Sequence, residues 1–123
     1  MKLLLDTHVF LWWRENGARI RRVRTAIATA DTVLVSAASA WEVAIKASLG
    51  KIRVPESFEQ AVEDSQFEKL AIEFRHAALV PSLPAYHTDP FDRMRIAQAH
   101  VEGLTLVTHD RALEPYGVPI LWA

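Results

Sequence analysis

The stretch at the start of the chain, Lys2-Leu3-Leu4-Leu5-Asp6-Thr7, most constrains the fold. Its three consecutive leucines lack the alternation of a strand with one wet face, and such a run predicts a strand covered on both faces, as in a parallel sheet. A helix-compatible segment, Thr7 to Trp13, follows at once and leaves Asp6 at the carboxyl end of the strand. Ligands of open α/β sheets bind at that edge. By itself, Asp6 is equally well explained as the N-cap of the helix.

Length and composition indicate one globular domain. The chain has 123 residues, half of them hydrophobic. A chain of this length can form one domain with a hydrophobic core and is too short for two. We therefore expect a single domain over residues 1–123. The chain has no cysteine, so any metal must be held by oxygen or imidazole. The sequence shows neither an apolar run that could cross a bilayer nor a signal-peptide pattern, so we expect a cytoplasmic protein with no membrane contact.

The net charge of -1 hides an uneven distribution along the chain. Residues 14–53 carry eight Lys or Arg against three acids, and residues 54–92 carry two against eight. Charge blocks of this kind usually form solvated helix faces. The alternative is a patch that contacts phosphate, made of four closely spaced arginines: Arg19, Arg21, Arg22 and Arg24.

Predicted strands and helices alternate along the first two thirds of the chain. Strands are predicted over residues 32–35 and, more briefly, 67–72. Helices are predicted over residues 18–30, 37–49, 58–66 and 73–80. Ser36 and Ser57 are N-cap candidates, Gly50 ends the second of these helices, and Ile52, Val54 and Pro55 are assigned to a loop.

The last third has the clearest boundaries. Asp89-Pro90-Phe91-Asp92 offers an N-cap, a proline at the first helical position and an acid at the third, and Gly103 ends that helix. Strands are predicted over residues 104–107 and 119–122. Alternating strands and helices give βαβ units, so the sequence predicts an α/β fold, a three-layer α/β/α sandwich with a central, mainly parallel sheet.

Four acidic residues fall at strand ends or in the helices next to them: Asp6, Glu42, Asp92 and Asp110. In a right-handed parallel sheet, all four can reach the same edge. Glu42 is the most informative, because it lies between Trp41 and a run of small apolar residues, where an unpaired carboxylate is costly to bury.

Each acid also has a simpler explanation. Glu42 could face solvent with Lys46 as its partner one turn on. Asp92 could stabilise the helix dipole, and Asp110 could be a turn former beside Arg111. The functional interpretation therefore depends on the set of four.

Carboxylates gathered at one place repel and raise one another's pKa unless a cation is present. We therefore expect a divalent metal. Mg²⁺ and Mn²⁺ prefer carboxylate and water oxygens, and a site of this kind activates water and stabilises charge on a phosphodiester. The reaction that these residues predict is phosphodiester hydrolysis.

Four parts of the sequence resemble, in order, the motifs of PIN-domain ribonucleases, and in particular the VapC-type toxins of bacterial type II toxin–antitoxin systems. They are Leu3-Leu4-Leu5-Asp6-Thr7, Ser36–Glu42, Asp89–Arg93 with Ile96–Ala99, and Leu106–Asp110. Any one of them is a weak pattern, but the ordered set spans nearly the whole chain.

The resemblance implies a PIN fold, an endoribonuclease activity that depends on Mg²⁺ or Mn²⁺, an RNA substrate and neutralisation by a small antitoxin. It makes Asp6, Glu42, Asp92 and Asp110 the catalytic and metal-binding set. Asp6 and Asp92 would be the principal metal ligands and Asp110 would complete the shell. Glu42 would orient or deprotonate the attacking water.

Three hydroxyl residues, Thr7, Ser36 and Thr108, are candidates to hydrogen-bond a carboxylate of this set or a substrate phosphate. Helix capping and strand ends explain them equally well. Asp89 is interpreted as the helix cap, although the choice between Asp89 and Asp92 as metal ligand stays open.

Histidines and tryptophans give two further expectations. His8, His87 and His109 fall near the predicted site segments without the spacing of a histidine metal centre, and His8 and His109 are candidates to contact the RNA backbone. Adjacent Trp12 and Trp13 cannot both point inward from one helix. We therefore expect this region to form a homodimer interface or a groove for an antitoxin helix.

Two other function classes fit a similar fold. A phosphate-handling enzyme or receiver-like switch would also use an acidic Mg²⁺ pocket. A haloacid-dehalogenase-type phosphatase, however, needs a second Asp two residues after the first, where this chain has His8. A receiver needs paired acids near the first strand and a Lys after a late strand, and neither is evident. A non-catalytic RNA- or protein-binding module would bind RNA equally well with and without metal.

Overall fold

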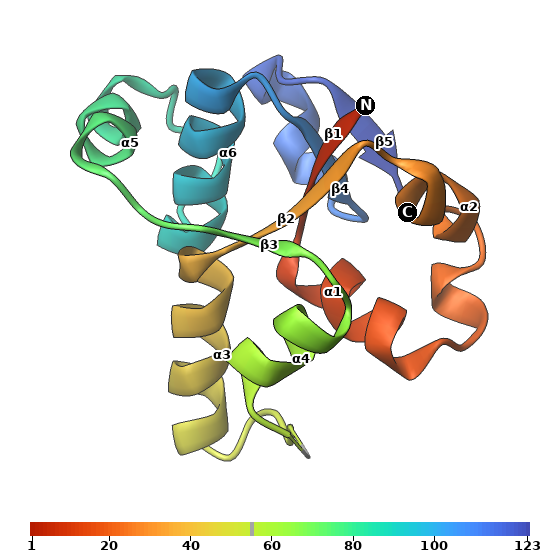
Figure 1. The fold of residues 1–123 in the computed structure, drawn as a ribbon. Coiled ribbons are helices and arrows are strands. Elements are labelled where there is room, and N and C mark those ends of the chain that lie inside the picture. The colour runs from red at the N-terminus through yellow and green to blue at the C-terminus, as the bar shows by residue number, and fades with distance from the viewer. Residues whose placement is uncertain (55) are drawn as a thin grey trace.

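The computed structural model describes residues 1–54 and 56–123, and its centre is a sheet of parallel strands in the order β3-β2-β1-β4-β5 (Figure 1). The strands are β1 (Lys2–Leu5), β2 (Thr32–Ser36), β3 (Glu68–Leu70), β4 (Thr105–Thr108) and β5 (Ile120–Trp122). The first strand is the central one, as its continuous apolar run predicts. The loop predicted at Pro55 lies outside the described residues.

Helices connect and cover these strands. The α-helices are α1 (Thr7–Glu15), α2 (Arg24–Thr29), α3 (Ala37–Ser48), α4 (Phe58–Asp64), α5 (Phe74–Leu79) and α6 (Pro90–Glu102). Short 3₁₀ helices are η1 (Ala18–Ile20), η2 (Val80–Ser82) and η3 (Arg111–Tyr116). Among the described helices, none is both long enough and apolar enough to cross a membrane.

The core has two parts, one on each face of the sheet. Leu3 and Leu5 point to one face, where α1, α2 and α4 pack, and Leu4 points to the other, where α6 and η3 pack. All three leucines have no exposed surface. The predicted three-layer α/β/α sandwich is therefore confirmed, and the reason is the one that its sequence suggested: a strand buried on both faces needs apolar residues at every position.

The helix predicted over residues 18–30 is wrong as one continuous element. The chain forms η1, then a turn, and only then α2. The stripe of Ile20, Val23 and Ile27 is nevertheless buried. The four arginines of this stretch would place like charges at helical neighbours, which destabilises a helix, and the guanidinium of Arg24 instead donates to the carbonyl oxygens of Asn16 and Gly17.

The two adjacent tryptophans of α1 are both half-buried against the same core. The ring of Trp12 lies against His109, and the ring of Trp13 lies against Phe67. The prediction that only one of them can pack inward is therefore wrong, because α1 offers two flanks to the core. More exposed aromatic side chains lie elsewhere, at Trp41 on α3 and Phe74 on α5.

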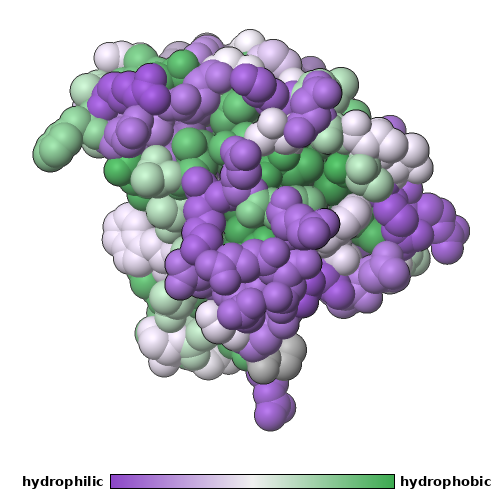
Figure 2. Space-filling view, viewed as in Figure 1, coloured by the Kyte–Doolittle hydropathy of each residue, from purple (hydrophilic) through white to green (hydrophobic). Residues whose placement is uncertain are grey.

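Edge strand β3 is short and charged. Lys69 in this strand pairs with Glu59 and Glu63 of α4, and Figure 2 shows hydrophilic side chains gathered over α4. A short edge strand that carries charge resists pairing with strands of other chains. This edge of the sheet is therefore protected.

Replacing Phe10 by Ala tests the core on the α1 side. Phe10 has no exposed surface and packs edge to face with Phe58. Its truncation leaves a cavity, so we expect Phe10→Ala to lower the free energy of unfolding by about 3–5 kcal/mol, measured by urea denaturation. Phe74→Ala is the matched control, because Phe74 is 95% exposed, and its effect should stay within about 0.5 kcal/mol. Equal effects of the two substitutions would contradict this core assignment.

Candidate active site

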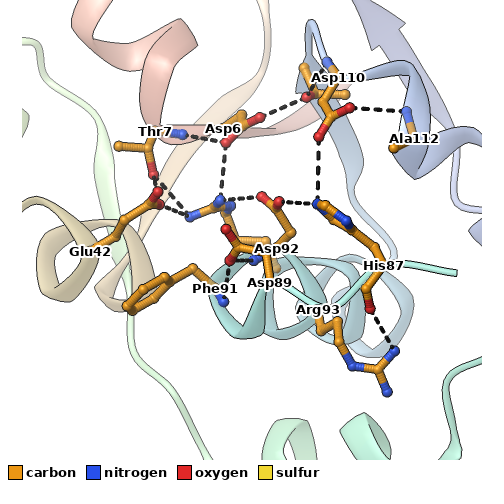
Figure 3. A network of polar contacts seen from close by, with 12 residues as sticks. Asp6, Thr7, Glu42, His87, Asp89, Phe91, Asp92, Arg93, Asp110 and Ala112 are labelled. Carbon is orange, nitrogen blue, oxygen red and sulfur yellow. Dashed lines mark hydrogen bonds and ion pairs between the residues drawn. The ribbon is translucent and has the colours of Figure 1, made fainter. Parts of the chain in front are cut away.

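The four predicted acids lie at the carboxyl edge of the sheet and form what we call the acidic cluster: Asp6, Glu42, Asp92 and Asp110 (Figure 3). Asp6 follows β1, Asp110 follows β4, Glu42 lies in α3, and Asp92 lies in the first turn of α6. A parallel sheet places these segments together because every strand ends at the same edge.

Three of the carboxylates converge on one guanidinium, that of Arg95 in α6. Its Nη2 lies 2.6 Å from Asp92 Oδ1 and 3.1 Å from Asp6 Oδ1, and its Nη1 donates to Glu42 Oε1 over 3.0 Å. Arg95 is only 2% exposed. Although burial acts to lower the pKa of Arg95, Asp6, Asp92 and Glu42 raise it above its ordinary value. The guanidinium is therefore a permanent buried cation.

The expectation of a divalent metal is based on repulsion among the four acids, and for three of them the structure supplies a cation of its own. Asp6, Glu42 and Asp92 already share the positive charge of Arg95, and Glu42 Oε2 also accepts from Lys46 over 2.7 Å. Their mutual repulsion is thus offset within the protein. The argument for a metal must come from the oxygens that Arg95 does not occupy.

Glu42 is buried and fully engaged. Its Oε1 accepts from the Thr7 hydroxyl over 2.7 Å as well as from Arg95. Burial acts to raise the pKa of Glu42, but the hydrogen bond from Lys46 and the charge of Arg95 outweigh it and lower that pKa. The structure thus combines the two alternatives considered for Glu42: its carboxylate is buried in the acidic cluster, and it also pairs with Lys46.

Asp92 has the opposite shift. Burial raises the pKa of Asp92 above its ordinary value, Asp6 and Asp89 raise it further, and Arg95 opposes them. Asp89 is the helix cap, as predicted, since its Oδ1 accepts from the backbone N–H groups of Phe91 and Asp92. Asp92 is therefore the member of this pair that points into the acidic cluster.

A second group of ligand atoms lies on the other side of Asp92. His87 Nε2 is 2.8 Å from Asp92 Oδ2 and 3.6 Å from Asp110 Oδ2. These three atoms lie within 4.8 Å of one another. Figure 3 shows His87 between Asp92 and Asp110, and Arg93 fixes the segment before α6 by donating to the carbonyl oxygens of Val80 and Pro84. Carboxylate oxygens and imidazole nitrogens are both ligands of divalent ions.

Thr108 joins Asp6 to Asp110. Its hydroxyl donates to Asp6 Oδ2 over 2.6 Å and accepts from the backbone N–H of Asp110 over 3.1 Å. Thr7 joins Asp6 to Glu42, because its N–H donates to Asp6 Oδ1 and its hydroxyl donates to Glu42. Two of the three predicted hydroxyl residues thus contact carboxylates of the cluster.

Ser36 is placed differently. Its hydroxyl caps α3 by accepting from the Ala38 N–H and donates to the side-chain oxygen of Gln98 in α6. Its hydrogen bonds therefore tie β2 and α3 to α6 and do not go to the acidic cluster.

An open cleft of about 260 Å³ adjoins the cluster. It is lined by two acids of the cluster and by side chains of α1 and the chain after β4: Asp6, His8, Trp12, His109, Asp110 and Arg111. The guanidinium of Arg111 stacks over the ring of Trp122, 4.0 Å from its centre. The walls of the cleft thus combine carboxylates with imidazole and guanidinium groups.

Sequence reasoning missed Arg95 and Ser39 and set His87 aside. Ser39 is fully buried and accepts from Arg95 Nη1 over 3.1 Å. A signal for Arg95 existed, because it lies three residues after Asp92 and next to Ile96 on the buried side of α6. Helical spacing of three places such a pair on one face. No spacing rule could have placed His87, because it lies in the irregular segment before α6.

The parallel sheet with an acidic cluster at its carboxyl edge can be compared with known protein families. The family model described as PIN domain matches residues 3–118, so the chain belongs to the PIN-domain family.

Individual proteins similar to this chain are more specific than the family model. Ribonuclease VapC22 of Mycobacterium tuberculosis is 32% identical over an alignment of 127 positions, which covers 95% of this chain and 93% of the relative. Two solved complexes share the fold. VapBC2 from Rickettsia felis, bound to a promoter DNA fragment, has a TM-score of 0.76 at 14% identity, with 100% and 99% of the two chains covered. DNA-bound VapBC from Salmonella typhimurium has a TM-score of 0.75 at 23% identity, with 99% and 98% covered.

Thr108→Val tests the hydroxyl that joins Asp6 to Asp110. The substitution keeps the shape but removes a buried donor to a carboxylate, so we expect the free energy of unfolding to fall by about 1–3 kcal/mol in urea denaturation. Thr105→Val is the matched control on the same strand, because Thr105 is only half-buried, and it should change stability by less than about 0.5 kcal/mol. Equal losses would show that the Thr108 hydroxyl contributes nothing specific.

Proposed function

We propose that this chain is a metal-dependent endoribonuclease of the VapC type, the toxin of a toxin–antitoxin pair that acts in the cytoplasm. The observation that carries the proposal is the convergence of Asp6, Glu42 and Asp92, from three distant segments, on one buried point beside an open cleft. Burying carboxylates is costly, so such a cluster is rarely maintained for stability alone. Family membership and the VapC22 relative support the same activity.

Mg²⁺ or Mn²⁺ fits the donor set of His87, Asp92 and Asp110, because one ligand atom from each residue lies within 4.8 Å of the other two. Carboxylates suit both ions, whereas imidazole is more typical of transition-metal ions and favours Mn²⁺. When bound, the ion lowers the pKa of a water molecule and stabilises negative charge on a phosphodiester. We propose that Asp6 contributes from the adjoining side, held by Thr108.

Glu42 orients the other groups in this proposal and does not take the proton. A general base works best when its pKa lies near the working pH, whereas the pKa of Glu42 is lowered and both of its oxygens already accept hydrogen bonds. Glu42 instead holds Thr7 and Arg95, and through them the positions of Asp6 and Asp92.

The cleft beside the cluster is the proposed RNA site. Phosphate groups would meet Arg111, whose position is fixed by stacking on Trp122, together with His8 and His109. Cationic groups position nucleic acid through the phosphate backbone without reading its sequence. The acids that line the cleft, Asp6 and Asp110, would then face the bond that is broken.

The antitoxin is proposed to bind along α1. A cavity of about 420 Å³ runs there, lined by Leu11, Phe58 and Arg53 among others. It shares His8 and Trp12 with the cleft beside the acidic cluster. A helix with an apolar face would fit such a groove. An antitoxin bound here would cover the approach to the cluster. The solved VapBC relatives are themselves complexes.

A homodimer is proposed through α3 rather than through the tryptophans of α1. Trp41 is 56% exposed and packs edge to face on Phe91. Ile45 on the same helix and Leu49, which caps its C-terminus, are also exposed. An apolar groove of about 250 Å³ lies beside Trp41 and Phe91 and extends to Met94. Exposed apolar patches of this kind mark protein contacts.

Removal of the metal or of Asp6 should abolish RNA cleavage. We expect purified protein to cut mixed cellular RNA in the presence of Mg²⁺ or Mn²⁺, and to stop when a chelator is added. Asp6→Asn should lower the cleavage rate by more than the roughly 10–100-fold that outer-shell partners of a metal contribute. Gel analysis of the RNA over time measures both effects.

Asp64→Asn is the matched control, because Asp64 is an exposed residue at the end of α4. It should cleave RNA like the unchanged protein. Cleavage that survives the chelator or Asp6→Asn would overturn the proposed chemistry. Equal RNA binding with and without metal, with no cleavage, would favour the non-catalytic module.

Trp12→Ala should weaken antitoxin binding more than Trp13→Ala does. Trp12 lines the α1 cavity, whereas Trp13 faces Phe67 on the other flank of the helix. Loss of a buried aromatic anchor at an interface typically costs about 2 kcal/mol or more, or roughly 30-fold in Kd. Calorimetric titration with the protein encoded beside this chain's gene measures the affinity. Unchanged affinity in both variants would place the antitoxin elsewhere.

A further inference from the structure

The acidic cluster is divided between two partners. Arg95 contacts one oxygen each of Asp6, Glu42 and Asp92. His87 faces the second oxygen of Asp92, together with Asp110. Asp92 therefore joins the two halves, with Oδ1 on the arginine side and Oδ2 on the histidine side.

The arginine side is closed to other ligands. Nη1 of Arg95 donates to Thr7, Ser39 and Glu42, and Nη2 lies between Asp6 and Asp92. The residue is 2% exposed, so its guanidinium has no open path to solvent. An ion bridging Asp6 Oδ1 and Asp92 Oδ1 would need the volume that Nη2 fills.

The charge balance of the acidic cluster also argues against a second divalent ion. When all four carboxylates of the acidic cluster are ionised, they carry four negative charges, and Arg95 and Lys46 supply two positive charges by direct contact. The two negative charges that remain match a single divalent ion. Asp89 is left out of this balance because it accepts backbone N–H groups at the N-terminus of α6. Buried charges must be compensated, and a second divalent ion would overcompensate them.

We propose that Arg95 holds the place of a second cation, so that this site takes one divalent ion, on the side of His87, Asp92 and Asp110. The inference rests on the proposed function, because it concerns the metal of the same site. Arg95 is a positioning residue in this scheme: it fixes Asp6, Glu42 and Asp92 and leaves the chemistry to the histidine side.

The number of bound ions tests the proposal without any activity measurement. Full-length protein is titrated with Mn²⁺, and the free ion is counted by electron paramagnetic resonance. We expect one ion per chain for the unchanged protein and two for Arg95→Met, because the freed oxygens can then accept a second ion. Arg95→Lys, which keeps the charge, should return the count to one.

Lys69→Met is the matched control. Lys69 also pairs with two carboxylates, those of Glu59 and Glu63, but it is exposed and both partners lie on α4, outside the acidic cluster. Its count should stay at one. A purely structural role of Arg95 would lower stability in Arg95→Met without adding an ion.

The position of the ion is tested separately. Spin-echo spectra of bound Mn²⁺ should show modulation from an imidazole nitrogen in the unchanged protein and lose it in His87→Gln.

The folding of Arg95→Met is checked by circular dichroism. If this variant folds only when Mn²⁺ is present, the bound ions are counted on the folded form. If it does not fold at all, the counts for the unchanged protein and Arg95→Lys decide.

Two ions bound to the unchanged protein, or one ion bound to folded Arg95→Met, would overturn the proposal. Absence of the nitrogen modulation would also overturn it. These failures are distinct from failure of the proposed function. Metal-dependent RNA cleavage with two bound ions would support the proposed ribonuclease activity and contradict the single-ion site. One bound ion without RNA cleavage would support the single-ion site and contradict the proposed activity.

Discussion

The contact on which the rest of the site depends is the buried guanidinium of Arg95 among three carboxylates. Asp6 lies between β1 and α1, Glu42 lies in α3 and Asp92 lies in α6, so one side chain links three segments that meet at the carboxyl edge of the sheet. Removal of one partner from a buried ion pair leaves an uncompensated charge, which is strongly destabilising. The site and the packing of these helices are therefore coupled.

This coupling also separates the roles of the acids. Glu42 has a lowered pKa and no free oxygen, which suits a residue that holds others in place. Asp92 has a raised pKa and divides its oxygens between Arg95 and His87. The pKa values of Glu42 and Asp92 are thus shifted in opposite directions because the two carboxylates have different partners. Asp110 is more exposed than either and lines the cleft.

Much of the fold could be predicted because the relevant signals are local. The run Leu3-Leu4-Leu5 predicted a strand buried on both faces, and Asp89-Pro90 with Gly103 gave the bounds of α6. The helix predicted over residues 18–30 failed because two short helical pieces joined by a turn bury its stripe of Ile20, Val23 and Ile27 equally well. An apolar stripe records which side chains are buried and does not require one continuous helix.

The sequence by itself determined the layer architecture and the positions of four acids at strand ends or in the helices next to them, because periodicity and capping act over a few residues. Only the tertiary structure decided what neutralises those acids. Arg95 is separated from Asp6 by most of the chain, and His87 lies in an irregular segment that Arg93 holds in place. Electrostatic partners are chosen by distance in space, and a distance between remote segments is fixed only when the sheet has brought its strand ends together.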